Sequence, residues 1–204
     1  MAGHRHAALT LGLLSLAACA DETVAPIDGG VISFAGELEG SDAVAAVALS
    51  GDEVALYVCG GSTSYATRSR WYLGKSDAGS AELASDDGGT AEVTVGDGEV
   101  SGTITEPGGE PFPFRLELMR ASGPGGLYFV IDSGCRTGVV VIDHGASSEP
   151  TVQGTWCSDQ DIFAQVTPIT PIDDTTREIQ VKTIATDLAP TKKLVVGFAD
   201  PAAF

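Results

Sequence analysis

The sequence has few basic residues and few histidines. Only 11 Lys and Arg stand against 28 Asp and Glu, which gives a formal net charge of −17. Because nucleic-acid phosphates and anionic lipid headgroups repel so acidic a chain, this balance argues against nucleic-acid binding. The histidines are His4, His6 and His144, and four scattered cysteines accompany them. This set lacks the ligand spacing of a zinc site.

The sequence also lacks an apolar run long enough for a transmembrane helix. The longest uncharged apolar stretch, Ala7 to Ala18, contains five leucines and follows Arg5. It is about twelve residues long, whereas a helix needs about 20 to cross a bilayer core. A short apolar run after a positive charge is typical of a secretory signal. We therefore interpret residues 1–18 as a signal peptide.

A cysteine follows this stretch directly. The segment Leu16-Ala17-Ala18-Cys19 resembles the lipobox of bacterial lipoproteins at all four positions. The resemblance implies a diacylglyceryl group on the Cys19 thiol and cleavage before it, with residues 19–30 as a lipidated tether. Ordinary signal cleavage is the alternative, but it does not need a cysteine there. One acyl chain binds a membrane reversibly, whereas two or three would anchor the protein. The cysteine is followed by Ala20 rather than by an aspartate. By resemblance to lipoprotein sorting in double-membrane bacteria, this favours the outer membrane.

Three further cysteines, Cys59, Cys135 and Cys157, remain after lipidation. A disulfide can form outside the cytoplasm, and an odd count leaves one free thiol. Cys135 lies in a turn-like segment, and Cys157 follows Trp156 at the end of an expected strand. We expect a Cys135–Cys157 disulfide with Cys59 as a buried thiol. A Cys59–Cys135 bond is the main alternative.

The rest of the chain shows no helical periodicity. Short apolar runs alternate with Gly, Asp and Ser, and 26 Gly and 10 Pro suit turns better than helix interiors. Strands at this spacing predict an all-β fold, an antiparallel meander that forms a sandwich or barrel. We expect this β domain over residues 31–145. Residues 146–204 form a looser β extension that either closes the same sheet or packs outside it.

Two hairpins can be predicted with their register. Residues 92–96 face 99–103 across Asp97-Gly98, the signal for a type I′ turn, and every facing pair agrees in polarity. Residues 44–50 fold onto 53–59 across Gly51-Asp52, a type II′ signal. Both faces of the second hairpin are apolar. We therefore expect it to be covered on two sides.

Several short motifs recur here in a familiar order. They are Tyr57-Val58-Cys59-Gly60-Gly61, Trp71, Gly74, Val100-x-Gly102-x-Ile104, Phe114 and Gly126-Leu127-Tyr128. This pattern, over Val31 to Asp132, resembles a β-rich module of uncharacterised secreted bacterial proteins. Gly60 stands where the module usually has aspartate. The resemblance implies a β fold and secretion, and it implies no activity.

No motif in the mature chain identifies a catalytic or metal site. Asp143-His144-Gly145 is typical of a polar turn, and no G-x-S-x-G elbow occurs. The acidic segments Asp86-Asp87, Asp97-Gly98-Glu99 and Asp173-Asp174 lack the order of a calcium loop. We therefore expect no catalytic residue, metal or cofactor.

One basic cluster occurs in the β region. Arg68, Arg70 and Lys75 flank Trp71 and Tyr72. Arg68, Arg70, Trp71 and Tyr72 are candidates for a partner contact. The alternative is that these cations neutralise neighbouring acids.

Together these features predict a lipid-anchored protein of the cell envelope that acts as a binding or scaffold module. Its partners would be the membrane, through Cys19, and an envelope protein or polysaccharide. A small carboxylate-dependent hydrolase of cell-wall or extracellular polymer is the alternative. Such an enzyme needs two carboxylates about 5–10 Å apart, and 28 acids make chance pairs certain.

Overall fold

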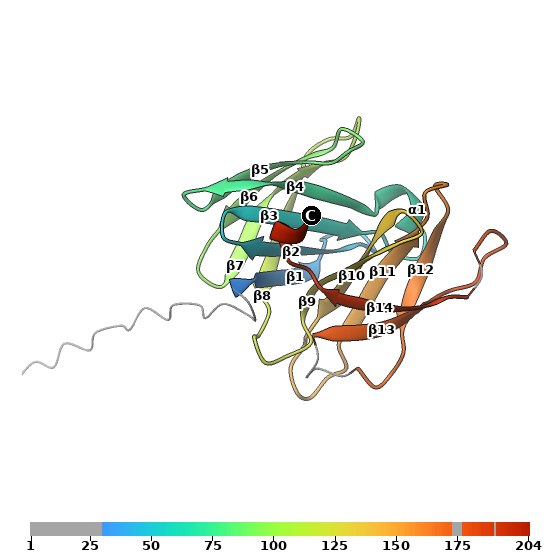
Figure 1. The fold of residues 1–204 in the computed structure, drawn as a ribbon. Helices are drawn as coiled ribbons and strands as arrows, with labels where there is room; N and C mark the ends of the chain where they lie inside the picture. Colours follow the sequence, from blue (N-terminus) through green and yellow to red (C-terminus); the bar gives the residue numbers. More distant parts are fainter. Residues whose placement is uncertain (1–29, 173–176, 190) are drawn as a thin grey trace, which may run out of the picture.

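The fold consists of two antiparallel β-barrels in succession (Figure 1). The computed structural model describes residues 30–172, 177–189 and 191–204. The first barrel comprises β1 (Ile32–Glu37), β2 (Val44–Ser50), β3 (Glu53–Cys59), β4 (Arg70–Asp77), β5 (Ser80–Ala84), β6 (Thr90–Val95), β7 (Glu99–Thr105) and β8 (Phe112–Leu118). The second comprises β9 (Gly126–Asp132), β10 (Cys135–Ile142), β11 (Thr151–Cys157), β12 (Phe163–Pro168), β13 (Glu178–Thr183) and β14 (Lys193–Phe198). The prediction of an all-β antiparallel fold is confirmed.

Each barrel closes through a short pairing between its first and last strands. β8 pairs with β1 at Phe34–Leu118 and Ala35–Glu117. β14 pairs with β9 at Gly197–Phe129 and Phe198–Tyr128. The helical elements of the described residues are α1 (Tyr65–Arg68), between β3 and β4, and the 3₁₀ turn η2 (Pro201–Ala203).

The chain passes from one barrel to the other between β8 and β9, over residues 119–125. The sequence grouped residues 31–145 apart from 146–204, but β9 and β10 pair with the later strands and not with β8. Residues 146–204 therefore complete a second barrel together with β9 and β10 and do not extend the first sheet. The sequence does not reveal this boundary between the barrels, because β9 and β10 have the same apolar character as the strands before them.

Both predicted hairpins form with the expected register. β6 and β7 pair Val95 with Val100 and Val93 with Gly102, and β2 and β3 pair Val47 with Leu56. Gly51 has φ +62°, as the first residue of a type II′ turn requires.

The type I′ turn expected at Asp97-Gly98 does not form. Only Gly98, at φ +78°, has a positive φ, whereas type I′ needs two such residues. The Gly98 carbonyl accepts a hydrogen bond from the Leu118 amide at 3.0 Å, so this turn also contacts β8. Two other turns do have positive φ at both residues. They are Ala78-Gly79, which connects β4 to β5, and Ser133-Gly134, which connects β9 to β10.

Each barrel has its own apolar interior. The side chains of the first interior come from all eight strands and include Leu56, Ile104 and Leu116. Those of the second come from all six and include Val139 and Val181. Strict alternation along β6, where Ala91 and Val93 are buried between exposed neighbours, produces this arrangement.

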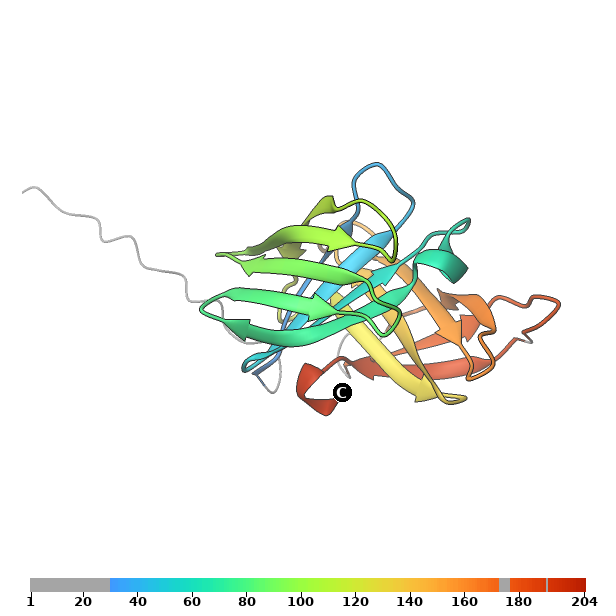
Figure 2. The ribbon, with the colours of Figure 1, turned by 90° about the horizontal axis from the view of Figure 1, so that it is seen from above.

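A third apolar layer joins the barrels. β2 directs Ala45 and Val47 into the first barrel, and Ala46 and Ala48 outward against β9 and β10 of the second. Both ribbon views show β9 and β10 beside β1–β3 (Figures 1 and 2). The expectation that the β2–β3 hairpin is covered on two faces is therefore confirmed.

Candidate functional site

A cleft of about 510 Å³ lies where the two barrels meet. Its walls come from the start of β4, the β5–β6 connection, the β9–β10 turn and the end of β11. Its volume lies within the usual range of small-ligand sites. A hollow of about 800 Å³ lies elsewhere, at the seam where β1 and β8 diverge, and Glu37, Glu39 and Arg115 contribute to its wall.

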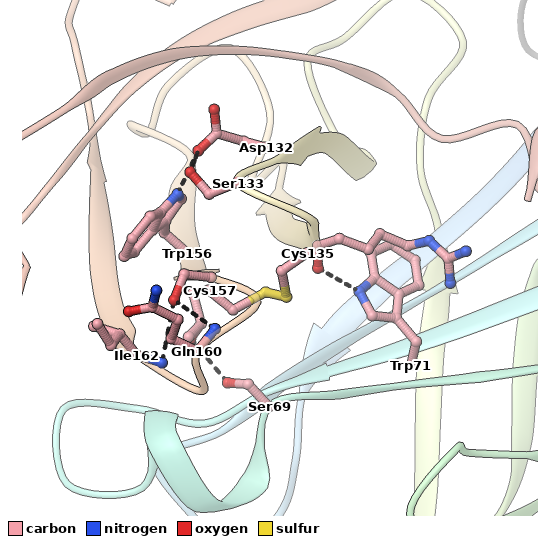
Figure 3. The surroundings of a disulfide bond; sticks show 12 residues. Ser69, Trp71, Asp132, Ser133, Cys135, Trp156, Cys157, Gln160 and Ile162 are labelled. Atoms are coloured by element: carbon pink, nitrogen blue, oxygen red, sulfur yellow. Dashed lines mark hydrogen bonds between the residues drawn. A yellow bond between two sulfur atoms is a disulfide. The ribbon is translucent and has the colours of Figure 1, made fainter.

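The disulfide between Cys135 and Cys157 forms part of the wall of the junction cleft (Figure 3). Their Cα atoms are 5.6 Å apart, and the bond links the first residue of β10 to the last residue of β11. Cys59 is a buried free cysteine. The preferred pairing is therefore confirmed, and the alternative Cys59–Cys135 bond is not formed.

Asp132 fixes the β9–β10 turn beside the disulfide. Its Oδ2 accepts a hydrogen bond from Trp156 Nε1 at 2.8 Å, and its Oδ1 lies 2.6 Å from Lys192 Nζ. Burial alone would raise the pKa of Asp132, but the bonds from Lys192, Trp156 and Ser133 outweigh it and lower the pKa. The carboxylate is thus held charged and serves as an anchor for three side chains.

Cys59 belongs to a small polar group between the barrels. Its Sγ lies 3.6 Å from Thr155 Oγ1, which in turn lies 2.8 Å from Ser69 Oγ. Gln153 Nε2 donates to the Cys59 carbonyl at 2.8 Å. Burial raises the pKa of the Cys59 thiol to about 11. Cys59 is therefore a protonated thiol at neutral pH and a poor nucleophile.

The four residues predicted as a partner contact do not form one surface. Tyr72 is fully buried inside the first barrel, and burial raises its pKa to about 12. Arg68 Nε lies 2.6 Å from Glu106 Oε1, and its guanidinium lies over the ring of Phe112. Because side chains alternate along β4, Trp71 and Tyr72 point to opposite faces. The four side chains therefore do not share one face, and a partner contact by the accessible ones among them stays a prediction.

Arg70 and Trp71 instead contribute to the cleft. Arg70 Nη2 donates to the Thr67 carbonyl and lies 3.6 Å from Asp87 Oδ2. Its Nε and Nη1 are buried and have no hydrogen-bond partner. Trp71 Nε1 donates to the Arg136 carbonyl at 3.1 Å, and its ring centroid is 4.6 Å from that of Tyr57.

Arg136 is a cleft residue that the sequence did not indicate. Its guanidinium lies 4.5 Å from the ring centroid of Phe204 and 5.6 Å from that of Trp71. No carboxylate in the described part of the chain lies within 4.0 Å of it, and its buried Nε has no partner. Burial lowers its pKa, and Asp86 partly opposes that effect. No local signal marks it, because its aromatic neighbours are distant in sequence.

Of the remaining sequence candidates, Asp86 and Asp87 contribute to the wall of the cleft, whereas His144 and Asp97 do not. His144 Nε2 lies 2.9 Å from Thr151 Oγ1 on an exposed surface. Asp97 occupies the β6–β7 turn, whereas Cys19 and Asp173-Asp174 lie outside the described residues. Within residues 30–172, 177–189 and 191–204, no three His, Cys, Asp or Glu side chains are grouped as metal ligands.

Comparison of the chain with family models, with curated proteins and with solved structures finds no match. In the part of the chain that the structure describes, no helix combines the length and the apolar character that a membrane span requires.

Proposed function

We propose that this protein is exported, anchored by lipid on Cys19 to the cell envelope, and acts there as a binding or scaffold module. The observation that carries the proposal is the lipobox-like Leu16-Ala17-Ala18-Cys19 behind a short apolar run. The Cys135–Cys157 disulfide supports it, because disulfides persist in oxidising compartments outside the cytoplasm.

The arrangement of the barrels favours binding as the role of the anchored domain. A continuous apolar layer holds the two barrels together, so the walls of the junction cleft come from one packed body. A preformed concave site on such a framework suits recognition, because little ordering is needed when a ligand binds. The anchor would concentrate this site at the membrane surface.

The test is to compare the native chain with Cys19→Ala in cells. Labelling with a radioactive fatty acid should mark the native protein and leave the variant unlabelled. Crosslinking in living cells, followed by affinity purification, should recover an envelope partner with the lipidated form. An unlabelled native protein would overturn the anchor. Labelling without any recovered partner from either form would overturn the scaffold role.

The hydrolase alternative is supported by three acids in the cleft wall, Asp86, Asp87 and Asp161. Burial raises the pKa of Asp87, but the hydrogen bond from Ser85 and the charge of Arg70 outweigh it and lower the pKa. A general acid needs the opposite shift. Changing each acid to Asn should abolish polymer hydrolysis with the fold intact if this alternative holds, and Asp97→Asn serves as the control.

A further inference from the structure

Unpaired donors gather at the junction cleft. Six buried side-chain nitrogen or oxygen atoms in the described residues lack a hydrogen-bond partner, and three of them belong to Arg70 and Arg136. Both arginines contribute to the wall of the cleft. Buried polar groups in native proteins are nearly always satisfied, and exceptions often indicate a missing water or ligand.

Among the described residues, Arg136 has no carboxylate partner although the protein is very acidic, with 28 acids and 11 basic residues. Arg177 likewise lies over an aromatic ring, that of Phe198, but it does not contribute to the cleft. Arg68, Arg70, Arg115, Lys75 and Lys192 each form an ion pair, but Arg136 contacts the aromatic faces of Phe204 and Trp71. This packing holds the guanidinium in place at the cleft. Its donors are therefore positioned before any ligand arrives.

The remaining wall restricts the ligand chemistry. Asp86, Asp87 and Asp161 face the same cleft, so a simple inorganic anion would meet three carboxylates as well as two guanidiniums. A ligand that carries both a carboxylate and several hydroxyls would suit the arginines and the aspartates together. Arginine binds a carboxylate through paired N–H groups, whereas aspartates accept hydrogen bonds from hydroxyls. Tyr57, Trp71 and Phe163 add apolar surface.

We propose that the junction cleft binds an acidic sugar residue, with Arg136 and Arg70 contacting its carboxylate and the cleft aspartates accepting from its hydroxyls. The inference rests on the proposed binding function and names the chemical class of its ligand. The cleft has room for a small ligand of this kind or for one such residue of an acidic polysaccharide.

The test is isothermal calorimetry on the full chain in detergent micelles, with three probes. Glucuronate should bind saturably. Glucose has the same ring without the carboxylate, and acetate has the carboxylate without the hydroxyls. Each should bind at least about tenfold more weakly, because each loses one set of charged or polar contacts. No saturable binding of glucuronate, or equal binding of acetate or glucose, would overturn the proposal.

Variants then assign the binding to the cleft. Arg136→Ala should weaken glucuronate binding by at least about tenfold, because the variant loses hydrogen bonds between two charged groups, which are stronger than neutral ones. Arg136→Lys and Arg70→Gln are further variants if Arg136→Ala does not fold, and each should also weaken binding. Arg115→Ala is the matched control, because Arg115 is 71% exposed and pairs with Glu99 away from the cleft.

Unchanged affinity in folded variants of Arg136 and Arg70 would also contradict the sugar site. The calorimetric result can be distinguished from a failure of the proposed envelope function. A partner recovered through the lipidated form, together with no glucuronate binding, would overturn the sugar ligand and leave the anchored scaffold standing.

Discussion

The two barrels differ in how their strands are connected. In the first barrel, two-residue turns at Gly51-Asp52 and Ala78-Gly79 join neighbouring strands directly. In the second barrel, only Ser133-Gly134 is comparably short. Its other connections span residues 143–150, 158–162, 169–177 and 184–192.

The barrels also differ in the size of their interiors. Among the described residues, 18 buried side chains fill the first interior and 11 fill the second. A smaller interior contributes less hydrophobic stabilisation, and longer loops cost more entropy to close. The disulfide lies in the barrel with the smaller interior. We infer that this covalent link compensates in part for the smaller core.

The largest expected effect comes from removing the disulfide. Changing both Cys135 and Cys157 to Ser should destabilise the second barrel by about 3 kcal/mol, the entropic contribution of a loop of this size. Amide hydrogen exchange followed by mass spectrometry should show lost protection in β9–β14 and little change in β1–β8. Reductant should affect the native protein in the same way and leave the double variant unchanged. Equal loss in both barrels would contradict the comparison.

The layer between the barrels provides a second test, because it is the place where they depend on each other. A Cβ added at Gly138 on β10 would lie 2.5 Å from atoms of the Tyr57 ring on β3. Tyr57 is 2% exposed and cannot move aside freely. Gly138→Ala should therefore cost about 1–3 kcal/mol, the range for overpacking a core. Urea unfolding and exchange should show both barrels weakened together.

Gly197→Ala is the matched control for that substitution. Gly197 also lies in a strand of the second barrel, but an added Cβ would meet nothing within 4 Å. The free energy of unfolding of the Gly197→Ala variant should be unchanged or slightly raised, because alanine restricts the conformations of the unfolded chain. If Gly138→Ala were as well tolerated as Gly197→Ala, the barrels would not be tightly packed through this layer.

The local parts of this fold could be predicted from the sequence, and the long-range parts could not. The β6–β7 register follows from polarity alternation around a short turn, since a slip by one residue would expose its apolar side chains. The β2–β3 register follows from its two-residue turn, because both faces of that hairpin are apolar. The closing pairs, β1 with β8 and β9 with β14, join distant segments that no neighbouring residues specify. The disulfide was predictable because its cysteines flank expected turns and strand ends.

The candidate site was mostly beyond sequence reasoning for the same reason. Arg70 and Trp71 stood out within a local basic and aromatic cluster, but Tyr72 beside them belongs to the core. Arg136 becomes visible only when the barrels pack and place Phe204 and Trp71 against it. Position relative to a second barrel, and not residue type, decides which of these side chains contribute to the cleft.

The smallest expected effect on stability concerns the first barrel. There a carboxylate links two loops by hydrogen bonds, as the disulfide links two strands of the second barrel. Asp42, between β1 and β2, accepts hydrogen bonds from Ser64 Oγ at 2.7 Å and from Thr63 Oγ1 at 2.9 Å. These hydrogen bonds lower the pKa of Asp42 from 3.8 to about 2, and the bond from Ser64 makes the largest contribution. Because the folded pKa lies below the unfolded one, this link is complete above pH 3.8 and is lost as pH falls towards 2.

Carboxyl titration by NMR measures this link directly. Asp42 should titrate near pH 2 in the native protein. Ser64→Ala should move its pKa upward more than Thr63→Val does, because the Ser64 bond is the larger cause of the shift. An Asp42 that titrates near 3.8 in all three proteins would mean that the carboxylate does not hold the β1–β2 loop against α1 in solution.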